Sequence, residues 1–90
     1  MVIGVSVLSE MELILEFMLT ANSPINGMTV KQVEEKFGIR IIHMHKGISE
    51  NMERYNPPKD KLMEAGWYIK IVGPYKRVSS LGVKAAPSLI

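Results

Sequence analysis

Hydrophobic and polar residues follow two different periods along this chain, and the period changes at Gly38. Before this glycine, three apolar residues recur at helical spacing and form a narrow stripe, as in a short helix that lies on a sheet: Val30, Val33 and Phe37. Thr29 and Gln32 have the spacing of a capping box that would start this helix. Beyond Gly38, the isoleucine-rich segment 39–42 is typical of a buried strand, because β-branched side chains pack well on a pleated surface.

Two more segments alternate with a period of two. In residues 12–20, a helix would bring Glu12 and Glu16 together, whereas a strand would set a wholly apolar face against a mixed one, and this contrast favours the strand. Residues 67–72 predict a further strand with three large apolar side chains on one face: Trp67, Ile69 and Ile71.

Residues 75–81, by contrast, have the spacing of two helical turns.

This pattern predicts an α+β fold in one small domain: a four- to five-stranded, mostly antiparallel sheet with two short helices on one side. Residues 1–11 would form an N-terminal connector or strand, and residues 12–81 the folded domain. Residues 48–56 could add a short return strand. Residues 82–90 have no period, so we expect a flexible tail there.

Length and charge narrow the classes of function. A chain of 90 residues buries only roughly 60 to 65% of the surface that it exposes when unfolded. Its folded state is therefore only marginally stable as a monomer, and we expect it to form oligomers. Its net charge of +2 is far from the basic stripe that DNA binding needs, so we expect no nucleic acid partner. The absence of cysteine suits a reducing cytoplasm, and we identify no apolar run long enough to span a bilayer.

Three short signatures follow one another along the chain: SPINGMT in residues 23–29, GIRIIHM in residues 38–44, and Pro58 followed by GWYIKIVGP in residues 66–74. Together they resemble the C-terminal regulatory domain of potassium-conductance regulator proteins, the RCK C-terminal or TrkA-C domain. The resemblance covers residues 12–81. It departs from the family at Trp67, where an acid is usual, and at Met28, where a basic residue is usual.

The resemblance implies a regulatory module that dimerises, senses a small nucleotide or an ion, and controls potassium or other cation transport through a membrane channel or transporter subunit. It would be cytoplasmic and peripheral to that transport protein. Some relatives bind cyclic di-AMP through an Asp-x-Arg on the helix and an Asn in the next strand. The matching positions here hold Gln32, Glu34 and Arg40, which does not favour that ligand. The Gly-x-Gly-x-x-Gly fingerprint is absent, so we expect no cofactor.

From the resemblance, and from the position of Arg40 inside an apolar run, we place the ligand site in segment 28–43. Arg40 would be its polar anchor, because a guanidinium suits an anionic ligand or a carboxylate of a dimer partner. Ile41 and Ile42 would be its walls. The remaining candidates in this segment are Met28, Thr29 and His43.

Two histidines and a tryptophan allow other interpretations. His43 and His45, at i and i+2 of one strand, could place two imidazoles on one metal ion or sense pH. A structural metal site usually has four protein ligands, so Glu50, Asp60 or a symmetry-related copy of the chain would have to supply the remaining ligands. We assign no metal site, because packed histidines are the simpler interpretation. Trp67 is either an interface anchor or a core residue.

Catalysis is not expected. No nucleophile beside a base is apparent, and Glu34 and Glu35 would not face each other on a helix because they are adjacent. Lys70, Lys76 and Arg77 form a small basic cluster that we interpret as a solvated face. The rival to a ligand sensor is a purely structural assembly module, which would pair subunits and bind nothing small.

Overall fold

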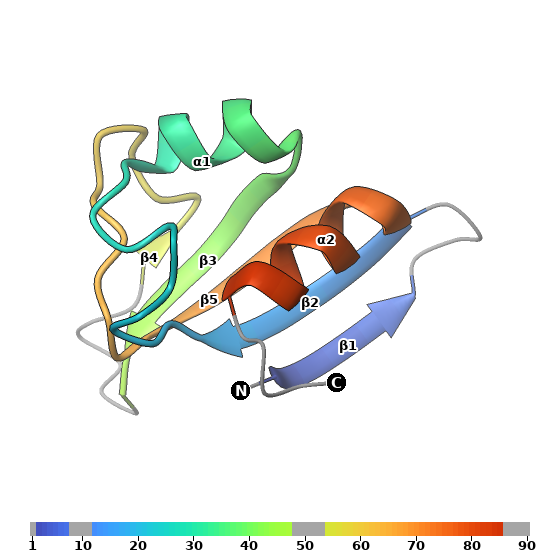
Figure 1. Ribbon diagram of the computed structural model, residues 1–90, viewed down its shortest axis with the longest axis horizontal. Coiled ribbons are helices and arrows are strands. Elements are labelled where there is room, and N and C mark those ends of the chain that lie inside the picture. Colours follow the sequence, from blue (N-terminus) through green and yellow to red (C-terminus); the bar gives the residue numbers. More distant parts are fainter. Residues whose placement is uncertain (1, 8–11, 48–53, 86–90) are drawn as a thin grey trace.

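The computed structural model describes residues 2–7, 12–47 and 54–85, and these residues form an α+β fold (Figure 1). The elements in chain order are β1 (Val2–Val7), β2 (Glu12–Met18), α1 (Val30–Phe37), β3 (Arg40–Lys46), β4 (Arg54–Tyr55), β5 (Trp67–Pro74) and α2 (Tyr75–Ala85). The predicted α+β class with two helices is therefore confirmed.

All the strands pair in one antiparallel sheet with the order β1-β2-β5-β3-β4. Strand β5 lies at the centre of the sheet, where it pairs with β2 on one side and with β3 on the other. Strands β2, β5 and β3 form the middle of the sheet, and β4 at one edge has only two residues, Arg54–Tyr55. This short strand falls within the predicted return segment 48–56, of which residues 48–53 lie outside the described part.

Both helices pack on the same face of the sheet. Helix α2 contacts β2 and β5, α1 contacts β3, and the two helices contact each other. The side chains that the sheet turns toward them are at least nine-tenths buried: Leu13, Leu15 and Phe17 from β2, Ile41 and Met44 from β3, and Trp67, Ile69 and Ile71 from β5. From α2, Val78 and Leu81 complete the core. The strand interpretation of residues 12–20 is thus confirmed over Glu12–Met18.

The structure adds detail to the predictions for the two ends of the chain. Helix α2 continues to Ala85, so the first four residues of the predicted tail 82–90 are helical. Residues 82–90 show no hydrophobic period in the sequence, but a glycine in a helix interior costs only about 1 kcal/mol, and Val78 and Leu81 in the preceding turns of α2 are fully buried. Residues 86–90 lie outside the described part of the chain. Within residues 1–11, Val2–Val7 form a strand.

Trp67 is a core residue in this fold. Its side chain is only 6% exposed, and Nζ of Lys61 lies 4.2 Å above the centre of its ring. A cation over an indole face is attracted by the ring's quadrupole. Of the two interpretations of this tryptophan, burial in the domain's own core is the one that the structure supports. Within the described residues, neither helix has the length and apolar character needed to cross a membrane.

Candidate functional site

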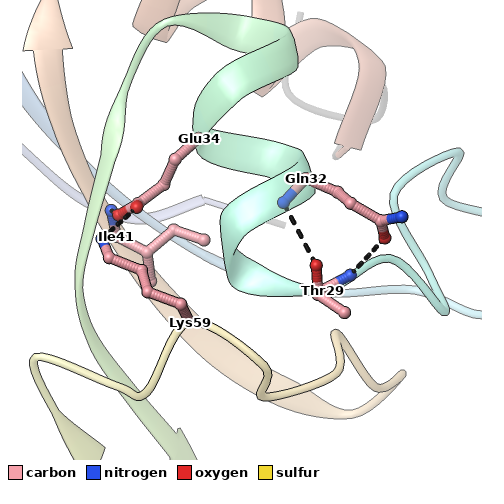
Figure 2. Close-up of polar contacts among 5 residues, drawn as sticks. All are labelled: Thr29, Gln32, Glu34, Ile41 and Lys59. Atoms are coloured by element: carbon pink, nitrogen blue, oxygen red, sulfur yellow. Dashed lines mark hydrogen bonds and ion pairs between the residues drawn. The ribbon is translucent and has the colours of Figure 1, made fainter.

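The predicted ligand segment is a helix followed by a strand, and its start is fixed by the capping box that the sequence predicts (Figure 2). The N–H of Gln32 donates to Oγ1 of Thr29 at 3.1 Å, and the N–H of Thr29 donates to Oε1 of Gln32 at 2.8 Å. At the other end, Gly38 takes a left-handed conformation with φ of 66°, which favours glycine because a side chain would be strained there. Its N–H donates to the carbonyl of Glu34.

Glu34 ties helix α1 to strand β3. One of its carboxylate oxygens accepts a hydrogen bond of 2.9 Å from the N–H of Ile41, and the other pairs with Nζ of Lys59 (Figure 2). The side chain of Glu34 is only 12% exposed, whereas that of Lys59 is 64% exposed. In the resemblance to RCK C-terminal domains, Glu34 matches a position that some relatives use to bind cyclic di-AMP. In this structure its carboxylate instead contacts Ile41 and Lys59 of the same domain.

Met28 and Thr29, the first two predicted ligand residues, are held by local structure. The N–H and hydroxyl of Thr29 are both used in the capping box. The carbonyl of Met28 accepts from the N–H of Met63 at 2.7 Å, and its N–H donates to Ile25 at 3.0 Å. Their role in ligand binding stays a prediction, and neither residue lines the hollow at Arg40 described below.

A β-bulge divides the other four predicted residues between the two faces of the sheet. Ile41 pairs with Ile71 of β5, but His43 pairs with Lys70, so Ile42 is an extra residue at which the register shifts. Bulges of this kind re-aim the side chains that follow them. Ile41 consequently lies in the core, while Arg40 and His43 lie opposite Val72 and Lys70, on the face that the helices do not cover.

A hollow of about 360 Å³ opens beside Arg40. Its lining comes from the ends of three neighbouring strands and the turn before β3: Glu12, Gly38, Ile39, Arg40, Val72 and Gly73. A Cβ at Gly73 would lie 3.2 Å from Cγ2 of Ile39, so the glycine allows Ile39 to pack closely against this part of β5. Arg40 is exposed, and its guanidinium can donate to a phosphate or carboxylate.

A second hollow, of about 290 Å³, lies between the two helices and is strongly basic. Its lining residues are Lys36 and Phe37 of α1 with Lys76, Arg77 and Ser80 of α2. Arg77 packs against Gly38, where a Cβ would come within 3.0 Å of its Cδ. The basic cluster that the sequence indicated is therefore split, because Lys70 lies on β5 opposite His43 and does not line this hollow.

The two candidate metal ligands are brought together, with their ring centres 5.2 Å apart. The third group beside them is Glu16, and the ligand atoms of Glu16, His43 and His45 all lie within 4.8 Å of one another. Sequence reasoning missed Glu16, because only the strand order places β2 near β3. Of the expected helpers, Asp60 is exposed and is not part of this cluster, and Glu50 lies outside the described residues.

No family model and no curated protein matches the sequence, but solved structures match the fold. The RCK_C domain dimer of S. agalactiae BusR in complex with c-di-AMP is similar at a TM-score of 0.62 and 18% identity, over 77% of this chain and 90% of that one. BusR in complex with its busAB-promoter DNA gives 0.64 and 18%, over 90% of this chain and 38% of that one. The GsuK RCK domain gives 0.55 and 13%, over 82% and 16%.

The chain therefore has the fold of an RCK C-terminal domain, as the three signatures predicted. The expectation that nucleic acid is excluded as a partner is wrong, because a protein containing this fold has been solved bound to promoter DNA. The net charge of +2 describes these 90 residues alone. Since the match covers 38% of that DNA-bound chain, the charge of one domain does not decide what a longer protein binds.

Proposed function

We propose that this chain is a regulatory domain that works as a dimer, in which a small ligand biases the contact between two copies. The observation that carries the proposal is its similarity to a ligand-bound dimer of RCK_C domains over 90% of that domain's length. A ligand moves an equilibrium between two arrangements only by its difference in affinity for them. A site near the dimer contact satisfies this requirement directly.

The hollow beside Arg40 is the place we propose for the ligand. Its volume of about 360 Å³ lies at the lower end of the range typical of small-molecule sites, roughly 300 to 1,000 Å³. Arg40 would recognise an anionic group, since a guanidinium binds phosphate or carboxylate through two parallel hydrogen bonds. Glu12 on the opposite wall would repel such a group, so we expect it to weaken the affinity.

A nucleotide with a phosphate group is the ligand class we propose, and cyclic di-AMP is the first probe because it is bound by the similar BusR domain. Gln32 and Glu34 are engaged in the cap and in contacts with Ile41 and Lys59. Recognition would therefore depend mainly on Arg40. The domain would carry no catalytic step of its own.

Two processes are candidates for what the domain regulates. The signatures in residues 23–29, 38–44 and 66–74 support control of potassium or other cation transport from the cytoplasmic side of a membrane. The alternative is control of transcription, which the DNA-bound BusR structure favours. Deleting the gene separates them: a growth defect at limiting potassium, rescued by the wild-type gene and not by Arg40→Gln, supports transport. Altered expression of one operon without that defect supports the alternative.

The ligand proposal is tested by thermal unfolding of the purified chain against a panel of cyclic dinucleotides and mononucleotides. A ligand at 100 times its Kd stabilises the folded state by about 2.7 kcal/mol, a rise of roughly 10 °C or more in Tm for a domain of this size. Arg40→Gln should abolish the rise. Lys46→Gln is the matched control, because it removes one positive charge from the other end of the same strand, and it should preserve the rise. A stable dimer that responds to no member of the panel would support the assembly module instead.

A further inference from the structure

Three side chains of types that can bind a metal ion converge on the sheet face that the helices leave uncovered. In the strand order, Glu16 of β2 lies opposite Lys70 of β5, and Lys70 lies opposite His43 of β3. His45 follows two residues later on β3, opposite Tyr68. The cluster is thus assembled from two strands that are not neighbours, with one strand between them.

The ligand atoms of Glu16, His43 and His45 lie within 4.8 Å of one another. His43 is only 8% exposed, and Glu16 and His45 are half-buried. Nδ1 of His45 is buried and has no hydrogen-bond partner among the described residues. A buried polar atom left without a partner costs about 1 to 3 kcal/mol, and a bound cation would supply the missing partner.

Each imidazole ring stacks on a tyrosine. His43 stacks on Tyr55 with ring centres 4.2 Å apart and planes 12° apart. His45 stacks on Tyr68 with centres 4.8 Å apart and planes 9° apart. Rings fixed in this way lose little freedom when they bind an ion, so less of the binding free energy is spent on ordering them.

We propose that Glu16, His43 and His45 form a binding site for a divalent transition-metal ion of the zinc type. Two imidazoles and one carboxylate are a ligand set that zinc accepts at metal–ligand distances of about 2.0 to 2.2 Å. In tetrahedral geometry such ligands lie about 3.3 Å apart, so the side chains must close inward by small rotations. Three protein ligands leave a fourth position for water or for an exogenous group.

Lys70 is the group that opposes the cation, because it lies between Glu16 and His43 in the same row. Its ammonium and the metal would compete for the carboxylate of Glu16. Replacing Lys70 with Gln should therefore tighten zinc binding, which is a response that a merely structural cluster of histidines would not give.

The test is titration of the 90-residue chain, freed of metal, with zinc by calorimetry and with cobalt by absorption spectroscopy. We expect one site per chain and a cobalt spectrum of nitrogen and oxygen ligands. Glu16→Gln should weaken zinc binding by at least roughly 10- to 100-fold, the loss typical even for an outer partner of a metal ligand. His45→Gln should do the same.

Glu35→Gln is the matched control, since Glu35 is an exposed acid on α1 and its loss should leave zinc affinity unchanged. Circular dichroism of each variant separates lost binding from lost folding, and a variant that does not fold is replaced by Lys70→Gln, whose tighter binding reports on the same site. Equal affinities in Glu16→Gln and Glu35→Gln, or no stoichiometric binding by the wild type, would overturn the proposal. The site is independent of the nucleotide proposal, which is tested in metal-free protein.

Discussion

The two faces of the sheet differ in what they bury. On the face covered by the helices, Phe17, Ile69 and Ile71 are completely inaccessible to solvent. On the other face, the residues next to them in sequence, Met18 and Lys70, are only half-buried. On the covered face, the buried side chains of β2, β3 and β5 are apolar, while the uncovered face carries carboxylate, lysine, imidazole and phenol groups. Folding free energy is concentrated on one face, and the groups capable of recognition are concentrated on the other.

The bulge in strand β3 determines which of its side chains lie on each face of the sheet. Without the bulge at Ile42, strict alternation would put His43 on the same face as Ile41, inside the core. With it, Met44 is fully buried opposite Ile69, and His43 and His45 are on the uncovered face. One extra residue in the strand thus puts a thioether, in place of an imidazole, into the apolar core under the helices, where it is a far better group.

The largest loss in the free energy of unfolding should come from removing a large side chain on the covered face. Phe17→Ala should lower the free energy of unfolding by about 3 to 5 kcal/mol, because it removes apolar contacts and leaves a cavity. Met18→Ala, one residue further along the same strand, should cost only about 1 kcal/mol because its side chain is half-exposed. Urea unfolding measures both, and similar losses would contradict the division of the two faces.

The next effect concerns the contact that holds α1 over the sheet. Glu34→Ala should cost about 1 to 3 kcal/mol, because the part-buried N–H of Ile41 loses its acceptor. Lys59→Ala should cost at most about 1 kcal/mol, since the lysine is exposed and its ion pair is screened by water. A double-mutant cycle between the two residues separates the hydrogen bond from the ion pair. If Lys59→Ala lowered the free energy of unfolding more than Glu34→Ala, the ion pair and not the hydrogen bond to Ile41 would be the main contact between α1 and the sheet.

A smaller effect is expected at the turn that ends α1. Gly38→Ala should cost about 1 to 2 kcal/mol, because an L-residue in the left-handed region is strained. Gly47→Ala is a close control, since Gly47 has the same φ of 66° but open space around its Cβ, whereas the Cβ at Gly38 would meet Arg77. The difference in unfolding free energy between the two variants measures that contact. If Gly47→Ala proved the more costly, the packing of Arg77 on Gly38 would be unimportant.

The smallest effect on stability is predicted on the uncovered face. His45→Leu in metal-free protein should leave the free energy of unfolding unchanged or raise it slightly, because a buried nitrogen without a partner is replaced by an apolar group. Thermal unfolding in a chelating buffer measures this. A loss of more than about 1 kcal/mol would mean that the imidazole is part of the structural framework, and that its orphaned nitrogen does not mark a binding site.

The sequence alone could predict features that depend on neighbours along the chain. The capping box of Thr29 and Gln32, the turn at Gly38 and the apolar face of residues 12–20 follow from local spacing, and each is confirmed. The convergence of Glu16 with the two histidines could not be predicted, because it depends on β5 lying between β2 and β3. The bulge at Ile42 leaves no sequence signal of its own, since no glycine marks it.

The central claim is that two copies of this domain form the working unit, and sedimentation equilibrium of the 90-residue chain tests it most directly. We predict a species of twice the chain mass of 10.1 kDa at micromolar concentration, with cyclic di-AMP or another nucleotide of the panel shifting the dimer's dissociation constant. A mass of 10.1 kDa at every concentration, with and without each nucleotide, would contradict the account.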